Sequence, residues 1–311
     1  MTMRRCIKCK GEPAIDLKSN NTAFCKEHFI EYFLRQVARA IKKYNMFSSD
    51  ERILVAVSGG KDSMALWDAL LSLGYNADGL HVDLGIGEYS TGSRRICENF
   101  AASRGARLYI LSLEDMYGTN MREIVRRTRR VSCSVCGTVK RYLMNLVVQQ
   151  KGYRVVATGH NLDDETAALL GNLFGWQEGY LARQYPHLPS THARLPARVK
   201  PLVRLGELET ETYCRLKGID YLADDCPLAR GATSLAYKEL INSLEEKMPG
   251  TKQRFLFGFW DRGRRNFTDT PVELKECSLC GQPTTAGTCL FCRLMQKAGL
   301  DPLIQPQVQE M

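Results

Sequence analysis

The chain has 311 residues, 44% hydrophobic and 25% charged, which is typical of a globular protein with room for about two domains. No apolar run approaches the roughly 20 residues that cross a bilayer, and none follows the N-terminal arginines, so we expect no membrane span or secretory signal and predict a cytoplasmic location. The net charge of +9 suggests a polyanionic partner, and the 12 cysteines of a cytoplasmic chain indicate metal or catalytic sites rather than disulfides.

Residues 1–30 carry the pattern of a small zinc finger. Two chelating pairs, Cys6-x-x-Cys9 and Cys25-x-x-His28, follow each other closely. This spacing is typical of a tetrahedral Cys3His zinc site, and four protein ligands indicate a structural rather than a catalytic ion. An apolar stripe over 29–44 predicts a helix, so residues 31–49 are expected to form a connecting helix and a linker.

A glycine-rich motif lies between an apolar strand pattern over 53–57 and a helical pattern over 64–71. Its residues are Ser58, Gly59, Gly60, Lys61, Asp62 and Ser63. The glycines let the backbone approach an anion, and the free N–H groups of the helix start favour phosphate. The motif lacks the spacing of a Walker A loop. It resembles the PP-loop of the ATP pyrophosphatases, which split ATP between the α and β phosphates; the alternative is a plain glycine turn.

Alternation of strands and helices predicts an α/β fold with a doubly wound parallel sheet over residues 50–268. The expected strands after the motif cover 77–83, 108–113 and 154–158, and the expected helices cover 95–104, 162–173, 205–217 and 234–248. Ligands of such sheets bind at the carboxyl ends of the strands. The loops after residues 57, 82 and 158 should therefore meet at one nucleotide.

The segment from Gly159 to Glu165 opens a helix behind a strand and contains two adjacent carboxylates, Asp163 and Asp164. Neighbouring helical residues diverge by about 100°, so one carboxylate can face the site while the other caps the helix or folds inward. A carboxylate near a triphosphate holds Mg²⁺ or orients a lysine. Plain capping of the helix start is the alternative.

A basic cluster between residues 122 and 141 surrounds a cysteine pair. Its members are Arg122, Arg126, Arg127, Arg129, Arg130, Lys140 and Arg141. It predicts contacts with nucleic-acid phosphates, or else a solvated helix face. Cys133 and Cys136 are expected just before a helix, with thiol pKa values lowered by the surrounding cations. Cys226 stands alone far along the chain, and the trio suits a cluster, a reactive thiol or a third zinc site.

The remaining C-terminal segments give simpler expectations. Residues 175–198 are predicted to be a polar surface loop. A second zinc module over 269–300 is predicted from the two pairs Cys277-x-x-Cys280 and Cys289-x-x-Cys292. Residues 301–311 are expected to be a loose tail.

Taken in order, these motifs resemble the tRNA 2-thiouridine synthetases of the TtuA/TtcA/CTU group. The two terminal zinc modules and Gly85-Ile86-Gly87-Glu88-Tyr89-Ser90 are most similar to the TtuA branch. The resemblance implies a PP-loop, adenine nucleotide alpha-hydrolase-like fold, and ATP-dependent 2-thiolation of ribothymidine at T-loop position 54. Alternatives within the class are the wobble uridine and an anticodon-loop cytidine. Alternatives outside it are an RNA-binding zinc protein without catalysis and a metabolic ATP-dependent amide ligase.

The resemblance also assigns residues, cofactors and partners. ATP would be held by Ala56, Val57, Ser58, Gly59, Gly60, Lys61, Asp62, Ser63, Val82, Lys140 and Gly159. Cys133, Cys136 and Cys226 match the ligands of a [4Fe–4S] cluster, and Lys140 and Asp164 match catalytic positions. The implied cofactors are ATP, Mg²⁺, two Zn²⁺ and the cluster. The implied partners are tRNA, a ubiquitin-like sulfur carrier with a C-terminal thiocarboxylate, and a second copy of the chain. A persulfide on Cys226 is the alternative to the cluster.

Overall fold

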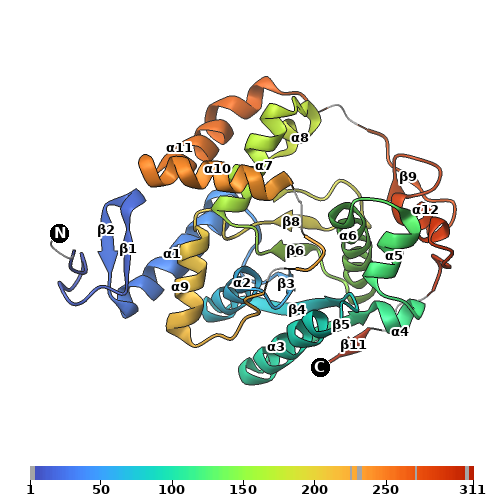
Figure 1. Cartoon of the computed structure of the whole chain (residues 1–311), viewed down its shortest axis with the longest axis horizontal. Helices are drawn as coiled ribbons and strands as arrows, with labels where there is room; N and C mark the ends of the chain where they lie inside the picture. The colour runs from blue at the N-terminus through green and yellow to red at the C-terminus, as the bar shows by residue number, and fades with distance from the viewer. Residues whose placement is uncertain (1–3, 225, 230–232, 270–271, 305–307) are drawn as a thin grey trace.

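A seven-stranded sheet forms the centre of the protein, which we describe from a computed structural model (Figure 1). The structure describes residues 4–224, 226–229, 233–269, 272–304 and 308–311. The strand order is β11-β5-β4-β3-β6-β8-β7. The bounds are β3 Arg52–Ala56, β4 Asn76–Asp83, β5 Leu108–Ser112, β6 Val155–Thr158, β7 His187–Leu188, β8 Ala197–Val199 and β11 Gln309–Glu310.

The five inner strands are parallel, which confirms the predicted doubly wound sheet. β3 pairs in parallel with β4 and β6, β4 with β5, and β6 with β8. The two edge strands run the other way, since β7 pairs antiparallel with β8 and β11 with β5. All carboxyl ends of the parallel strands therefore meet at one edge of the sheet, where the predicted loops lie.

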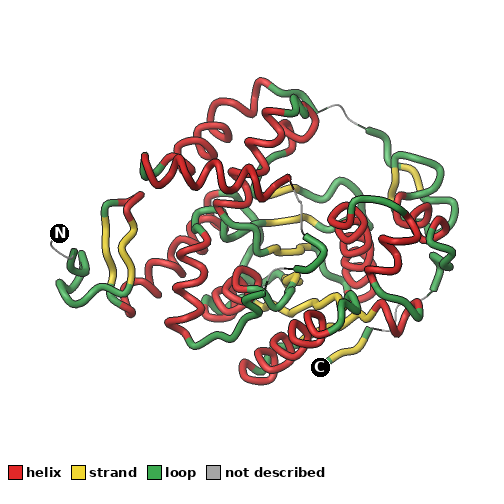
Figure 2. The backbone as a smooth tube through the Cα atoms, in the orientation of Figure 1, coloured by secondary structure: helices red, strands yellow, loops and turns green. Residues whose placement is uncertain are grey.

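Helices cover both faces of the sheet, as Figure 2 shows. One core gathers side chains from α1 (Lys26–Lys43), α2 (Lys61–Ser72), α3 (Glu88–Arg104), α7 (Leu162–Phe174) and α9 (Glu207–Lys217). The other gathers them from α4 (Leu113–Tyr117), α5 (Met121–Thr128), α6 (Ser132–Lys151) and α12 (Leu290–Lys297). Within β3, Ile53 and Val55 belong to the first core and Leu54 to the second, because successive strand residues point to opposite faces.

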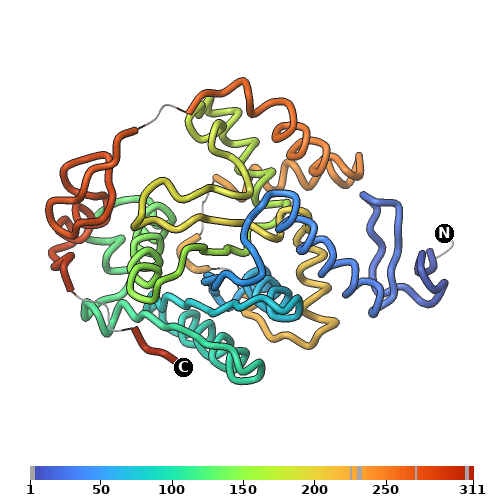
Figure 3. Tube along the Cα trace, turned by 180° about the vertical axis from the view of Figure 1, so that it is seen from behind, coloured from blue at the N-terminus to red at the C-terminus, as the bar shows by residue number. Residues whose placement is uncertain are grey.

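Two small modules lie at opposite ends of the molecule, and the view from behind shows the same arrangement (Figure 3). The N-terminal module is a hairpin of β1 (Ile15–Leu17) and β2 (Thr22–Phe24), with the 3-10 helix η1 (Lys18–Asn20) between its strands. Its Phe24 stacks on Tyr32 of α1. The C-terminal module combines β9 (Lys275–Glu276) and β10 (Pro283–Thr284) with α12, and Phe291 of α12 stacks on Tyr142 of α6 at 3.6 Å between ring centres.

Five further helices complete the described part of the fold. They are α8 (Glu178–Arg183), α10 (Thr233–Lys247), α11 (Thr251–Gly258) and the short helices η2 (Phe259–Gly263) and η3 (Arg264–Asn266), which continue α11. The described residues include no helix that is both long and apolar enough to cross a membrane.

Two predictions about irregular segments were wrong. The expected polar loop over 175–198 contains α8 and β7, and β8 begins at Ala197. Its prolines and polar residues hide any strand periodicity, and only pairing with β6 defines β8. The expected loose tail supplies β11, where Glu310 meets Arg107 at 3.1 Å and Lys151 at 2.9 Å; residues 305–307 of that tail lie outside the described ranges.

Candidate active site

The glycine-rich motif forms the turn from β3 into α2, as predicted. Gly59 has a φ of +76°, and a Cβ there would lie 2.9 Å from the Ser93 carbonyl oxygen, so both conformation and space require glycine. Gly60 is extended with a φ of −80° and is the N-cap of α2. The first N–H groups of α2 have no partner within the helix, and they point beyond the carboxyl end of β3.

Hydroxyl groups fix the shape of this turn. The Ser63 hydroxyl donates to the Gly60 carbonyl at 2.9 Å and accepts the Ser58 N–H at 3.1 Å. The Ser93 hydroxyl of α3 donates to the Ser58 carbonyl at 2.5 Å. The buried His81 ring on β4 lies 3.0 Å from the Val57 carbonyl through Nδ1. The turn is therefore held in place before any anion binds.

A pocket of about 220 Å³ opens beside the turn. Its lining includes Ala56, Val57, Ser58 and Val82, which the family resemblance assigns to ATP. Lys140 from α6 and Cys226 from the loop before α10 line the same pocket. The tertiary structure thus brings the nucleotide loop, a lysine and a cysteine to one cavity, although they are far apart in the sequence.

Gly159 does not line this pocket but lies against the motif itself. A Cβ at Gly159 would be 2.9 Å from the Asp62 carbonyl carbon and 2.9 Å from the Ser63 nitrogen. The loop after β6 and the start of α2 therefore pack backbone against backbone. Only glycine permits this approach, whatever further contact Gly159 makes with a nucleotide.

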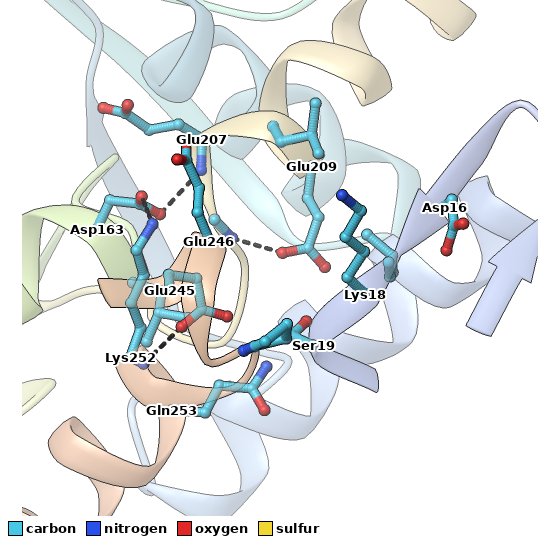
Figure 4. A pocket seen from close by; sticks show the side chains of 15 residues that line it. Asp16, Lys18, Ser19, Asp163, Glu207, Glu209, Glu245, Glu246, Lys252 and Gln253 are labelled. Carbon is cyan, nitrogen blue, oxygen red and sulfur yellow. Dashed lines mark hydrogen bonds and ion pairs between the residues drawn. The ribbon is translucent and has the colours of Figure 1, made fainter. Parts of the chain in front are cut away.

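The two adjacent carboxylates of α7 point in different directions. Asp163 is buried, contacts Lys252 and accepts the Glu207 N–H at 3.1 Å, as Figure 4 shows. Asp164 caps its own helix by accepting the Asn161 N–H at 3.2 Å, and it also meets Lys238 at 2.7 Å. One carboxylate therefore folds inward, and the other both caps the helix and pairs with a lysine.

Charged side chains continue this arrangement to the glycine-rich turn. Lys61 Nζ lies 2.9 Å from Asp62 and 3.8 Å from Glu207. Asp62 also accepts hydrogen bonds from Asn161 at 3.0 Å and Thr210 at 2.6 Å. Burial opposes ionisation of Asp164, but the nearby positive charge of Lys238 outweighs it and holds the Asp164 pKa below its usual value. The ionised form of Asp164 is thus favoured, and these contacts hold the carboxylates around the turn in position.

The cysteine trio converges at the start of α6. The Ser132 hydroxyl donates to the Leu228 carbonyl at 2.7 Å, and this hydrogen bond places the Cys226 loop against the helix. Cys133 is exposed, whereas Cys136 and Cys226 are partly buried. The described residues include only two sets of His, Cys, Asp and Glu whose ligand atoms all lie within 4.8 Å, and the trio is not one of them. This wider spacing is unlike that of thiolates sharing one zinc ion.

Two expectations about the trio were wrong. Cys133 and Cys136 lie within the first turns of α6, which begins at Ser132, and do not precede the helix. Burial raises the Cys136 pKa and outweighs the lowering effect of the nearby charges of Lys140 and Arg141, so the net shift is opposite to the predicted one. The basic cluster could be read from the sequence, but the burial of the thiol could not.

The N-terminal module brings its four predicted ligands together. Cys6, Cys9, Cys25 and His28 have ligand atoms within 4.8 Å of one another. The Cys9 and Cys25 sulfur atoms are 3.7 Å apart, and His28 Nδ1 is 3.2 Å from the Cys25 sulfur. A tetrahedral zinc ion about 2.3 Å from each sulfur sets a separation of about 3.8 Å, so the donors fit that ion.

The C-terminal module also brings its four predicted ligands together. The ligand atoms of Cys277, Cys280, Cys289 and Cys292 also lie within 4.8 Å of one another. The Cys277 and Cys292 sulfur atoms are 3.9 Å apart, and those of Cys280 and Cys289 are 3.7 Å apart. The Cys289 N–H donates to the Cys277 sulfur at 3.2 Å, an orienting contact typical of a thiolate that holds a metal.

The arginines of the basic cluster are exposed on α5, after its end and on α6, whereas Lys140 is only partly exposed and lines the pocket. Arg126 and Arg127 each lie 2.6 Å from Glu123, and their hydrogen bonds lower the Glu123 pKa to about 2. Arg127 also donates to the Ala298 carbonyl at 3.0 Å and so ties α5 to the C-terminal module. Arg126, with 75% of its side chain exposed, is the freer cation of the two.

Sequence reasoning missed two charged residues of the site, Glu207 at the start of α9 and Lys238 on α10. Neither belongs to a recognisable motif, and Lys238 is 74 residues from its partner Asp164. Asn161 carried a usable signal, because an Asn three residues before an acid predicts a capping box.

Two family models match the chain. One, described as a PP-loop domain, covers residues 31–229, and the other, the N-terminal LIM domain of 2-thiouridine synthetase TtuA, covers residues 5–30. Over 290 residues the chain is 49% identical to a tRNA-5-methyluridine(54) 2-sulfurtransferase of Thermus thermophilus, a match that covers 93% of the chain and 90% of the relative. Its identity to the Thermotoga maritima protein of the same name is 43%, in a match that covers 94% of this chain and 96% of that relative.

A solved structure is also similar. It is the U34-tRNA thiolase NcsA of Methanococcus maripaludis with its [4Fe-4S] cluster, and it superposes with a TM-score of 0.80. The sequence identity is 25%, and the match covers 95% of this chain and 97% of NcsA.

Proposed function

The chain belongs to the PP-loop family of tRNA 2-sulfurtransferases, and we propose that it thiolates C2 of 5-methyluridine at position 54 of tRNA in an ATP-dependent reaction. The observation that carries this proposal is the shared pocket of the glycine-rich turn, Lys140 and Cys226. The pocket supports a reaction in which a nucleotide is activated beside a sulfur-handling cysteine. An amide ligase or a non-catalytic RNA-binding protein would not need this combination.

The first step is adenylation of the uracil. Oxygen O2 is a poor leaving group, and its attack on the α phosphate of ATP forms the O2–P bond and releases pyrophosphate. The turn from Ser58 to Ser63 would hold the phosphates through its free N–H groups and Lys61. Lys140, at the edge of the pocket, would neutralise charge that develops on the α phosphate. A sulfur nucleophile then attacks C2, and AMP leaves with O2.

Cys133, Cys136 and Cys226 would hold a [4Fe–4S] cluster. Three thiolates at the end of one helix and an adjoining loop fit a ligand set spread over several irons, and NcsA carries such a cluster. When bound with three protein ligands, a cluster keeps one iron open, and that iron can present sulfide to a substrate. A persulfide on Cys226 is the other use of the same thiols. Both uses need Cys226 at the pocket.

The remaining cofactors follow from the donor sets. We assign one structural zinc ion to each terminal module, because each offers four ligand atoms at the spacing of a tetrahedral ion. Mg²⁺ would accompany ATP, with Asp62 and Asp164 as candidate carboxylate ligands. The sulfur carrier and a homodimer stay predictions from the resemblance, testable by thioester capture and sedimentation. The cytoplasmic location stays a prediction from the sequence, testable by cell fractionation.

The experiment is a thiolation assay with nucleoside mass spectrometry. Anaerobic protein reconstituted with iron and sulfide should convert position 54 and release AMP and pyrophosphate. Cys136→Ala should abolish thiolation but leave ATP binding intact, and Cys97→Ala, a buried cysteine outside the trio, is the matched control. ADP as the main product would refute the PP-loop assignment, and full activity of iron-free protein would favour the persulfide.

A second candidate is thiolation of the wobble uridine, favoured by the similarity to the U34-tRNA thiolase NcsA. Two tRNA variants separate the candidates. A cytidine at position 54 should abolish product if our assignment is right, whereas a cytidine at position 34 should leave the yield unchanged. The reverse pattern would establish the wobble position as the target.

A further inference from the structure

Lys238 occupies an unusual position beside the glycine-rich turn. Its ammonium group lies 2.7 Å from an Asp164 oxygen and 2.6 Å from a Glu207 oxygen. The same Glu207 oxygen lies 3.8 Å from the ammonium group of Lys61. Lys61 at the start of α2 and Lys238 on α10 therefore share the carboxylate of Glu207.

The ion pairs among these lysines and carboxylates should rearrange when a triphosphate binds beside them. Two lysines, 61 and 238, stand against three carboxylates, Asp62, Asp164 and Glu207, so the group carries one net negative charge. The phosphates of ATP add several more negative charges next to it. The cations of the group are then the natural partners of the new anion.

Lys238 is free to make that exchange. A fifth of its side chain is exposed, so Lys238 is not sealed inside the protein. Asp164 would keep the hydrogen bond that it accepts from the Asn161 N–H. Asp164 and Glu207 both lie in the first turn of a helix, where a carboxylate is stabilised without a lysine.

We propose that Lys238 is a second phosphate-binding cation of the ATP site. When ATP binds, Lys238 breaks its ion pairs with Asp164 and Glu207 and contacts the β and γ phosphates, and then the departing pyrophosphate. The inference rests on the ATP site of the proposed function. It also gives an order of events, because Asp164 is released from its lysine only after ATP has bound.

The test measures the affinity of ATP, pyrophosphate and AMP for the full chain by calorimetry. Lys238→Met should weaken ATP and pyrophosphate binding by about tenfold or more, the usual effect of losing a charge-assisted contact, and leave AMP unchanged. Lys238→Arg should retain most of the affinity. Lys247→Met, at the exposed end of the same helix, is the matched control and should change nothing.

Glu207→Gln separates phosphate binding from a purely structural ion pair, and serves if Lys238→Met does not fold. Our inference predicts several-fold tighter ATP binding, because the carboxylate competes with phosphate for both lysines. A structural pair predicts weaker binding of all three ligands. Equal ATP affinity of wild type and Lys238→Met would overturn the inference alone, whereas normal ATP binding without tRNA thiolation would overturn only the proposed function.

Discussion

Replacing Gly159 by alanine tests whether backbone packing positions the glycine-rich turn. The new methyl carbon would lie 2.9 Å from both the Asp62 carbonyl carbon and the Ser63 nitrogen, well inside ordinary contact distance. Neither atom belongs to a flexible side chain, so the loop after β6 or the start of α2 must move. Overpacking of this kind costs about 1–3 kcal/mol.

The expected result is a lower urea midpoint together with ATP binding weakened by about tenfold, since displaced N–H groups no longer converge on the phosphates. Gly258→Ala is the matched control. It lies at the end of α11 with a φ of −60° and nothing within 4 Å of a new Cβ, so it should stabilise the helix by up to about 1 kcal/mol. Wild-type urea midpoint and ATP affinity in Gly159→Ala would refute the packing argument.

Three more predictions address the modules, the basic surface and pH. Elemental analysis of fresh protein should find two zinc ions per chain, and Cys9→Ser should remove one and lower the folding yield; an unchanged zinc content would contradict the assignment. Arg126→Glu should weaken tRNA binding and reduce its salt dependence in filter-binding assays, whereas flat binding across salt would exclude this surface. Burial raises the pKa of Glu209 from 4.5 to about 7, so the folded chain holds that proton more tightly than the unfolded chain. Stability should therefore fall by up to about 3 kcal/mol as pH rises from 4.5 to 7, and Glu209→Gln should remove this fall in pH-dependent urea denaturation; an identical slope in the variant would contradict it.

The acidic pocket that contains Glu209 shows why such a shift arises. The cavity, of about 320 Å³, lies between the N-terminal module and the starts of α7 and α9 (Figure 4). Glu209 is buried there, and its carboxylate accepts the Gly206 N–H at 2.6 Å as part of a capping box. The hydrogen bonds from the Gly206 N–H and the Tyr32 hydroxyl do not replace the water that the carboxylate loses on burial, so the pKa of Glu209 rises.

The local motifs of this protein were determined by the sequence alone. The strand, turn and helix around Ser58–Ser63 follow from short-range patterns, since apolar periodicity and glycine conformation act within a few residues. The Cys-x-x-Cys pairs and Cys25-x-x-His28 likewise fix which atoms can meet within one turn. The alternation of strands and helices then predicted the parallel sheet, because parallel neighbours need crossover connections.

Only the tertiary structure decided which distant groups meet. The pairing of β11 with β5 joins segments about 200 residues apart, and a two-residue strand has no periodicity to reveal it. Lys238 of α10 contacts Asp164, and Cys226 from the loop before α10 lines the same pocket as Lys140. The raised pKa of Cys136 depends on burial by residues remote in the chain. Such contacts depend on how whole elements pack, and no local sequence pattern encodes the partner of a single charged or thiol group.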